Sequence, residues 1–251
     1  ENFGKMRLEQ QLLRALFPSS ILARLLTREK HDIIADRYDN STVLFVYIEG
    51  YSDLCYSTDM HRVIEWLNEA FSAMDRELKK MGSKVVKVET FQNLILVVSG
   101  CPEKSADHAE HCARAAVLLH RAAVQVTRPD GQSTSLRIGI SSGSISAGVV
   151  GAQSPRFSVF GDAVNTASRM ASTADASSGF SISVHLSETT AGLLKKDFLE
   201  EMRKQEGLML SKRGDGMQIK GKGFMLTYYW KGVSDAQSPP KRVSSPVQMT
   251  S

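Results

Sequence analysis

Apolar positions in the middle of the chain alternate between strand-like and helix-like spacing. The run Ser41–Ile48 is almost continuously apolar, which predicts a buried strand. Apolar residues then recur every three or four positions, which predicts the buried face of a long helix that Thr58 or Asp59 caps. That face consists of Met60, Val63, Ile64, Leu67, Phe71, Met74 and Leu78.

The same change of spacing repeats further along the chain. Two β-rich runs, Lys84–Glu89 and Asn93–Gly100, are joined by a short turn. Helical spacing then covers about 106–126, and Ser135–Ile140 is again strand-like. The order β-α-β-β-α-β is that of ferredoxin-like sheets.

In this topology the first and second strands run parallel, with the third strand between them. The end of the first strand, near Tyr47, therefore meets the hairpin turn at Gln92 and Asn93. We expect these three residues to lie together at one edge of the sheet.

The chain divides into three regions. Residues 1–36 hold a helical run that Pro18 ends and a linker, residues 37–231 hold the folded domain, and the Ser- and Pro-rich residues 232–251 are expected to be disordered. Late in the domain we expect a helix with Asp162 as its N-cap and two strands around a Gly-Lys-Gly turn. The predicted fold class is α/β (α+β), with a ferredoxin-like core and a C-terminal αβ extension.

Composition narrows the functional classes. The formal net charge of +4 comes from 31 basic and 27 acidic residues that are scattered along the chain, which argues against nucleic-acid binding. The longest apolar run is Val43–Ile48, far below the roughly 18 residues of a membrane span. We therefore expect a cytoplasmic domain without direct membrane contact, from a parent protein that is either soluble or membrane-bound.

Cysteines and histidines do not form a recognisable metal or disulfide pattern. The cysteines are Cys55, Cys101 and Cys112, an odd number without a CxxC pair, which fits a reducing compartment. His108, His111 and His120 lie on or near the second helix, and we expect surface or core-edge positions for them.

Seven sequence blocks carry a resemblance to a known family. They are RYDNSTVLF (Arg37–Phe45), KVET (Lys87–Thr90), VVSG (Val97–Gly100), LRIGI (Leu136–Ile140), AGVVG (Ala147–Gly151), PRFSVFGDAVNTASRM (Pro155–Met170) and IKGKG (Ile219–Gly223). In these blocks and their order, the chain resembles the catalytic domain of class III nucleotide cyclases, and the guanylate cyclase branch in particular.

The resemblance implies a specific reaction and assembly. The ribose 3'-hydroxyl of GTP attacks the α-phosphate, which gives cyclic GMP and pyrophosphate with the help of two magnesium or manganese ions. The site forms between two domains of a head-to-tail dimer. One domain supplies the metal carboxylates, and the other supplies base recognition and transition-state groups. The N-terminal helix would then be a signalling and dimerisation helix.

The metal half of the site departs from the family pattern. Tyr47, in FVYIEGY, stands where the family has its first aspartate, and Asn93, in KVETFQNLI, stands where it has the second. A phenol and an amide hold magnesium far more weakly than carboxylates do. Glu49 could offer a substitute carboxylate, although a solvent-facing or salt-bridged strand residue is the favoured interpretation. Arg137 matches an arginine of the same half-site.

The base-recognition half is largely kept. Glu89 matches the family's guanine-reading glutamate. A carboxylate suits this role because it can accept hydrogen bonds from both N1–H and the exocyclic amine of guanine. Ser158 stands where guanylate cyclases usually carry cysteine. It either contacts O6 of guanine or is simply a small strand residue.

The resemblance also assigns ribose and phosphate contacts. Asn165 would orient the ribose, and Arg169 would stabilise charge on the α-phosphate, four residues along the same helix face. Lys220 would reach the triphosphate, whereas Lys222 is expected to face solvent.

Three functional hypotheses follow. The leading one is a guanylate cyclase subunit that binds GTP and forms a heterodimer with a cyclase partner holding the metal ions. The alternative is a catalytically silent pseudo-cyclase that serves as a dimerisation or allosteric module. A weak homodimeric cyclase that uses Glu49 ranks last.

Overall fold

The computed structural model describes residues 13, 16–27, 33–177 and 181–232. Its strands are β1 Ala35–Ile48, β2 Val86–Phe91, β3 Leu94–Ser99, β4 Leu136–Val150, β5 Arg156–Phe160, β6 Ser183–Ser187, β7 Leu208–Lys212, β8 Met217–Ile219, β9 Gly223–Met225 and β10 Thr227–Gly232. Its α-helices are α2 Ser19–Thr27, α3 Tyr51–Ser57, α4 Met60–Lys80, α5 His108–Ala123, α6 Asp162–Ser172, α7 Glu188–Leu193 and α8 Lys196–Glu206.

One large sheet organises the domain, with the strand order β2-β3-β1-β4-β6-β10-β7. β1 pairs antiparallel with β3 and β4, and β3 pairs antiparallel with β2. β1 and β2 are therefore parallel with β3 between them, which confirms the predicted ferredoxin-like core. β4 is long enough to pair with β1 along one edge while its other edge is shared by β6 and β5.

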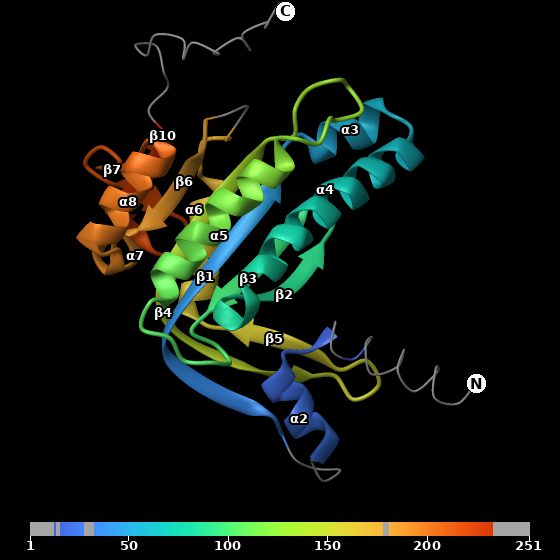
Figure 1. The fold of residues 1–251 in the computed structure, drawn as a ribbon, viewed down its shortest axis with the longest axis vertical. Helices are drawn as coiled ribbons and strands as arrows, with labels where there is room; N and C mark the ends of the chain where they lie inside the picture. The colour runs from blue at the N-terminus through green and yellow to red at the C-terminus, as the bar shows by residue number, and fades with distance from the viewer. Residues whose placement is uncertain (1–12, 14–15, 28–32, 178–180, 233–251) are drawn as a thin grey trace, which may run out of the picture.

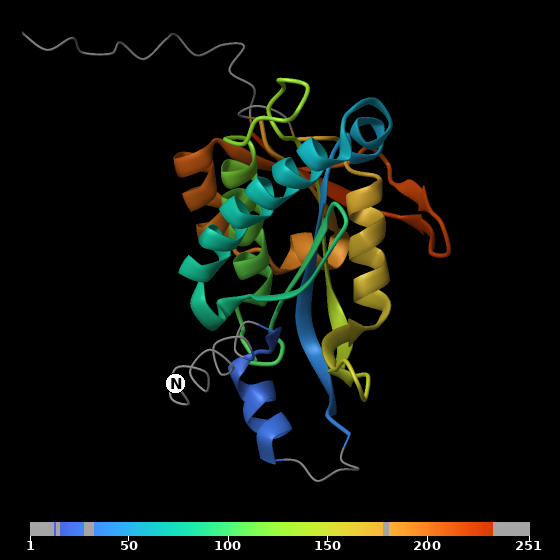
Figure 2. The same ribbon diagram turned by 90° about the vertical axis from the view of Figure 1, so that its right-hand side faces the viewer.

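Helices cover both faces of this sheet (Figure 2). α4 and α5 pack on one face, and α8 lies beside α5, tied to it by the ion pair between Arg114 and Glu201 (Figure 1). α6 packs on the other face. β1 is buried on both sides, with Leu44 in one apolar cluster and Phe45 in the other, which explains its continuous apolar run.

α6 approaches β4 closely because its inner face is made of small residues. Ala167 and Ala171 are fully buried against Gly139 of β4. A Cβ atom at position 139 would lie 2.0 Å from the backbone nitrogen of Ala171. Only glycine at this position allows the observed helix-to-strand distance.

We expect Gly139→Ala to destabilise the domain by about 3 kcal/mol, because the added methyl group meets helix backbone that cannot turn aside. Gly192→Ala in α7 is the matched control, since a Cβ there has no atom within 4 Å. Urea unfolding of both variants measures the difference. Equal midpoints would contradict the close packing of α6 on β4.

The C-terminal extension differs from the prediction in detail. α7, α8, β6 and β7 were not predicted, and the two expected strands after Met217 are three, since β8 and β9 form a small hairpin before β10. The proposed cap of α6 was also wrong. Gly161, with φ of 138°, is the N-cap, and Asp162 is the first helical residue without a capping hydrogen bond.

The histidines of α5 were expected at surface or core-edge positions. His111 is half-buried, as expected, whereas His108 and His120 are only 5% and 4% exposed and are buried more deeply than expected. The expected N-terminal helix and the C-terminal tail lie almost wholly outside the described residues. Within the described part of the chain, no helix has the length and apolar character needed to cross a membrane.

Candidate functional site

Glu89 owes its orientation to an irregularity in β2. The pairing of β2 with β3 shifts between Lys87 and Glu89. Val86 is paired with Val98 and Glu89 with Leu96, and both partners belong to the apolar cluster beneath α6. Because cross-strand partners project from the same face, the bulge turns the Glu89 side chain onto the α6 face. Strict alternation from Val86 would have directed it towards α4 and α5.

Ser158 lies in the middle of β5, half-buried and paired with Gly148 of β4. Its neighbours Phe157 and Val159 are buried. β5 and β2 contact each other, so the strands that carry Ser158 and Glu89 lie side by side.

α6 carries the two residues assigned to ribose and phosphate. Asn165 and Arg169 are both exposed and lie about one helical turn apart. Ser168, between them on the same helix, lies 3.4 Å from the Tyr47 hydroxyl through its Oγ.

The β8–β9 turn is fastened to the start of α6 through a lysine. Lys222 pairs with Asp162, and its side chain is only 21% exposed, so the expectation that it faces solvent was wrong. Lys220, in the same turn, is the exposed lysine. The hairpin therefore lies next to the helix that carries Asn165 and Arg169.

Tyr47 and Asn93 meet at the ends of β1 and β3, as predicted. Tyr47 is paired with Leu94, and the backbone N–H of Ile48 donates to the Asn93 carbonyl over 2.8 Å. The Asn93 side-chain amide donates to the Ile48 carbonyl, also over 2.8 Å. Gln92, in the turn, has a φ of 51°, a left-handed conformation that favours glycine.

Glu49 forms a bidentate ion pair with Arg137. Arg137 Nη2 donates to Glu49 Oε1 over 3.0 Å, and Arg137 Nε binds the other carboxylate oxygen. The hydrogen bonds that Arg137 donates to the Glu49 carboxylate raise the pKa of Arg137 above its ordinary value. Arg137 also donates to the carbonyl of Ala174 over 3.2 Å.

This end of the sheet does not fit a divalent metal ion. Tyr47 and Asn93 are neutral, and both oxygens of Glu49 are already bound. Among the described residues, no three histidine, cysteine, aspartate or glutamate side chains gather as metal ligands would. A hard cation prefers several free carboxylate oxygens, which are lacking here.

Exposed aromatic residues accompany the predicted site residues. Phe91, Phe160 and Phe224 are 57%, 53% and 64% exposed. Phe91 and Phe160 follow Glu89 and Ser158 by two positions, and Phe224 follows the Lys220 turn. Large apolar side chains at the surface are typical of interaction sites. The sequence pattern alone did not single them out.

The sequence of the chain is similar to that of a known protein family. Residues 33–232 match the family model described as the adenylate and guanylate cyclase catalytic domain. The receptor-type guanylate cyclase gcy-28 of Caenorhabditis elegans is 34% identical over 241 residues, which is 95% of this chain and 18% of that protein. An adenylate cyclase of Mycobacterium tuberculosis is 34% identical over 230 residues, covering 92% of this chain and 48% of that protein.

Solved structures agree in fold. The guanylate cyclase domain of RhGC from Catenaria anguillulae, in complex with GTP, has a TM-score of 0.67 and 32% identity, covering 78% of this chain and 97% of that one. A dimeric guanylyl cyclase domain of RhoGC from Blastocladiella emersonii has a TM-score of 0.63 and 30% identity, with coverage of 78% and 97%. The chain spans less than half the length of the curated relatives named above.

Proposed function

Because the chain belongs to the family of adenylate and guanylate cyclase catalytic domains, we propose that it is the base-recognising subunit of a heterodimeric guanylate cyclase. In this role Glu89 and Ser158 bind guanine, Asn165 orients the ribose, and Lys220 and Arg169 bind the phosphates. A partner cyclase domain supplies the carboxylates that hold magnesium or manganese. The products are cyclic GMP and pyrophosphate.

A contrast between two parts of the chain carries this proposal. Glu89, Asn165 and Arg169 are exposed, so a nucleotide could reach them. At the Tyr47 end, the polar groups are neutral or satisfied within the chain. If one subunit supplies the metal carboxylates and the other supplies the base and phosphate contacts, we expect a subunit to lose the residues of only one half-site.

Base choice rests on Glu89. Relatives of both adenylate and guanylate cyclase type are equally similar in sequence, so overall identity does not select GTP. The β2 bulge that directs Glu89 towards α6 and β5 supports a purine pocket on this side. A carboxylate there pairs with two guanine donors that adenine lacks.

Exposed apolar side chains support a partner subunit. Phe91, Phe160 and Phe224 lie close in sequence to the proposed nucleotide contacts. A partner subunit that covers these side chains would also lie next to the proposed nucleotide contacts and complete the nucleotide site. Burial of such side chains contributes favourably to association.

A pseudo-cyclase is the second candidate. Two contacts favour it: the hydrogen bond between Tyr47 and Ser168 and the ion pair between Glu49 and Arg137. They occupy the polar side chains at the Tyr47 end without a bound metal ion. In that case the chain would serve as a dimerisation or allosteric module. The same ion pair argues against a homodimeric enzyme that uses Glu49, because releasing that carboxylate would cost its contacts with Arg137.

One assay separates these candidates. We expect no detectable cyclic GMP from the purified chain with GTP and either magnesium or manganese, because its own carboxylates are replaced or bound. Product should form when a cyclase domain with both metal aspartates is added, provided that this domain carries a mutated base pocket and is inactive alone. Stable complex formation without product would favour the pseudo-cyclase, and product from a verified homodimer would contradict the heterodimer.

We expect Glu89→Lys to lower the ratio of GTP to ATP efficiency in the heterodimer by about a hundredfold, since two guanine donors lose their acceptor. Glu69→Lys, on exposed α4 surface, is the matched control with the same charge change. The ratio of kcat/KM values for the two nucleotides is the measurement. An unchanged ratio would remove Glu89 from the purine pocket.

A further inference from the structure

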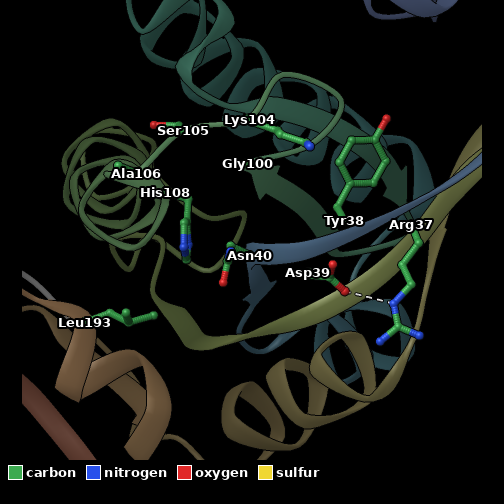
Figure 3. A pocket seen from close by; sticks show the side chains of 10 residues that line it. All are labelled: Arg37, Tyr38, Asp39, Asn40, Gly100, Lys104, Ser105, Ala106, His108 and Leu193. Carbon is green, nitrogen blue, oxygen red and sulfur yellow. Dashed lines mark hydrogen bonds and ion pairs between the residues drawn. The ribbon is translucent and has the colours of Figure 1, made fainter.

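A separate cavity lies at the opposite end of the sheet from Tyr47 and Asn93. It has a volume of about 500 Å³ and is formed by the start of β1, the loop after β3, the start of α5 and the end of α7 (Figure 3). The walls include Arg37, Asn40, Gly100, Lys104, His108 and Leu193. From Asn40 to Ile48, β1 extends roughly 26 Å, so this cavity is distinct from the metal end. Its size is that of a small-molecule site.

Two backbone features open this cavity. The pairing of β1 with β4 shifts between Tyr38 and Ser41, so the intervening residues leave the regular ladder and Asn40 lines the wall. Gly100 has a φ of 81°, and a Cβ there would lie 2.6 Å from the Asn40 carbonyl. Glycine therefore lets the loop after β3 close against the irregular segment of β1.

His108 lines the cavity with its imidazole ring. It is 5% exposed, and its imidazole points into the space between Asn40 and Leu193 (Figure 3). Nδ1 lies 2.6 Å from the Thr42 hydroxyl. Nε2 forms no hydrogen bond with any residue that the structure describes, so it is available to a ligand in the cavity.

A chain of buried hydroxyl groups fixes the His108 ring. Thr42 Oγ1 lies 2.7 Å from Ser142 Oγ, which lies 2.9 Å from Thr190 Oγ1. All three hydroxyl residues are buried. Since this network holds the Nδ1 side of the ring, Nε2 has a set position in the cavity wall.

The cavity carries one uncompensated positive charge. Arg37 is balanced by Asp39, whose carboxylate accepts from its Nε over 2.9 Å. Lys104 lines the cavity and makes no ion pair or hydrogen bond with any described residue, and its ammonium group is turned towards Tyr38 (Figure 3). The nearby Asp107 carboxylate is bound by Lys195. A free cation and an imidazole N–H that line the same cavity suit an anionic group.

We propose that this cavity binds the phosphate or carboxylate group of a small organic anion, which accepts hydrogen bonds from Lys104 Nζ and His108 Nε2. The remaining volume, lined by Asn40, Gly100 and Leu193, takes the body of the molecule. This site is separate from the α6 residues of the proposed nucleotide site, because it lies on the α5 side of the sheet whereas Asn165 and Arg169 lie on the α6 side.

The test uses the 251-residue chain with labelled histidine side chains. Inorganic phosphate and acetate are titrated separately in the millimolar range, and the His108 ring signals are followed by NMR. We expect a saturable shift with at least one of them. Phosphate alone would indicate a phosphoryl ligand, and acetate alone a carboxylate. Because the signal is local, binding of phosphate beside Arg169 does not mimic it.

Variants establish which groups bind. Lys104→Met should lower the affinity for the anion about tenfold. Lys79→Met, which removes an exposed lysine of α4, should leave the affinity unchanged. His108→Asn retains a polar group at the position of Nδ1 for Thr42 but lacks Nε2, and calorimetry should give a similar loss. If that variant does not fold, Lys104→Met still decides. The absence of a saturable shift, or equal affinity in Lys104→Met and the natural chain, would overturn the proposal.

Discussion

A chain carrying Tyr47→Asp, Gln92→Gly and Asn93→Asp should make cyclic GMP as a homodimer, with magnesium or manganese and without a partner. The two new carboxylates would be adjacent, since Tyr47 is paired with Leu94 and Ile48 is hydrogen-bonded to Asn93. Glycine at position 92 suits the positive φ of the turn. Arg137 is already bound to Glu49, so it leaves the new carboxylates free. Oxygen ligands of this kind are what both metal ions prefer.

Two controls make this result specific. Tyr47→Asp alone restores only one anion and should remain at background. Adding Arg169→Ala to the triple variant should abolish the new activity while leaving the dimer intact, as judged by sedimentation. A folded, dimeric triple variant without product would show that the retained half-site is not competent, and the pseudo-cyclase would become the better description.

In the heterodimer, Arg169→Ala should lower kcat about a hundredfold and change KM little. The guanidinium faces charge that grows on the α-phosphate only as the reaction proceeds, so its loss acts on the transition state. Arg76→Ala removes an exposed arginine from α4, on the other side of the sheet, and should leave both constants unchanged. Steady-state kinetics with GTP gives the comparison.

A rise in KM with unchanged kcat would contradict this role, because it would make Arg169 a ground-state phosphate contact. Arg169 would then belong with Lys220 as a binding residue, and another group would have to stabilise the transition state.

The core of the fold could be predicted because its elements are long and strongly periodic. β1 is buried on both sides, so its continuous apolar run identified it, and α4 was identified by the helical period of its apolar face. The meeting of Tyr47 with Asn93 followed from topology. The functional roles of Glu89, Asn165 and Arg169 came from the family resemblance and not from the spacing of residues.

The remaining features depend on backbone detail that residue patterns do not encode. The β2 bulge changes the face of Glu89 without a glycine or proline to signal it. Asp162 looks like an N-cap, yet it pairs with Lys222, a residue 60 positions away. β6 and β7 have five residues each, too few for a distinct period. His108 became informative only once Thr42 and the cavity were seen beside it.

β4 has a consequence for the stoichiometry of the assembly. Arg137 in this strand lies opposite Tyr47, and Gly148 in the same strand lies opposite Ser158. The strand between positions 137 and 148 is roughly 36 Å long, which is too far for one nucleotide to bridge. In the proposed heterodimer, Ser158 and Tyr47 of one chain would therefore face different nucleotide sites. In the proposed heterodimer only one of the two composite sites is complete, so each pair of chains turns over one GTP at a time.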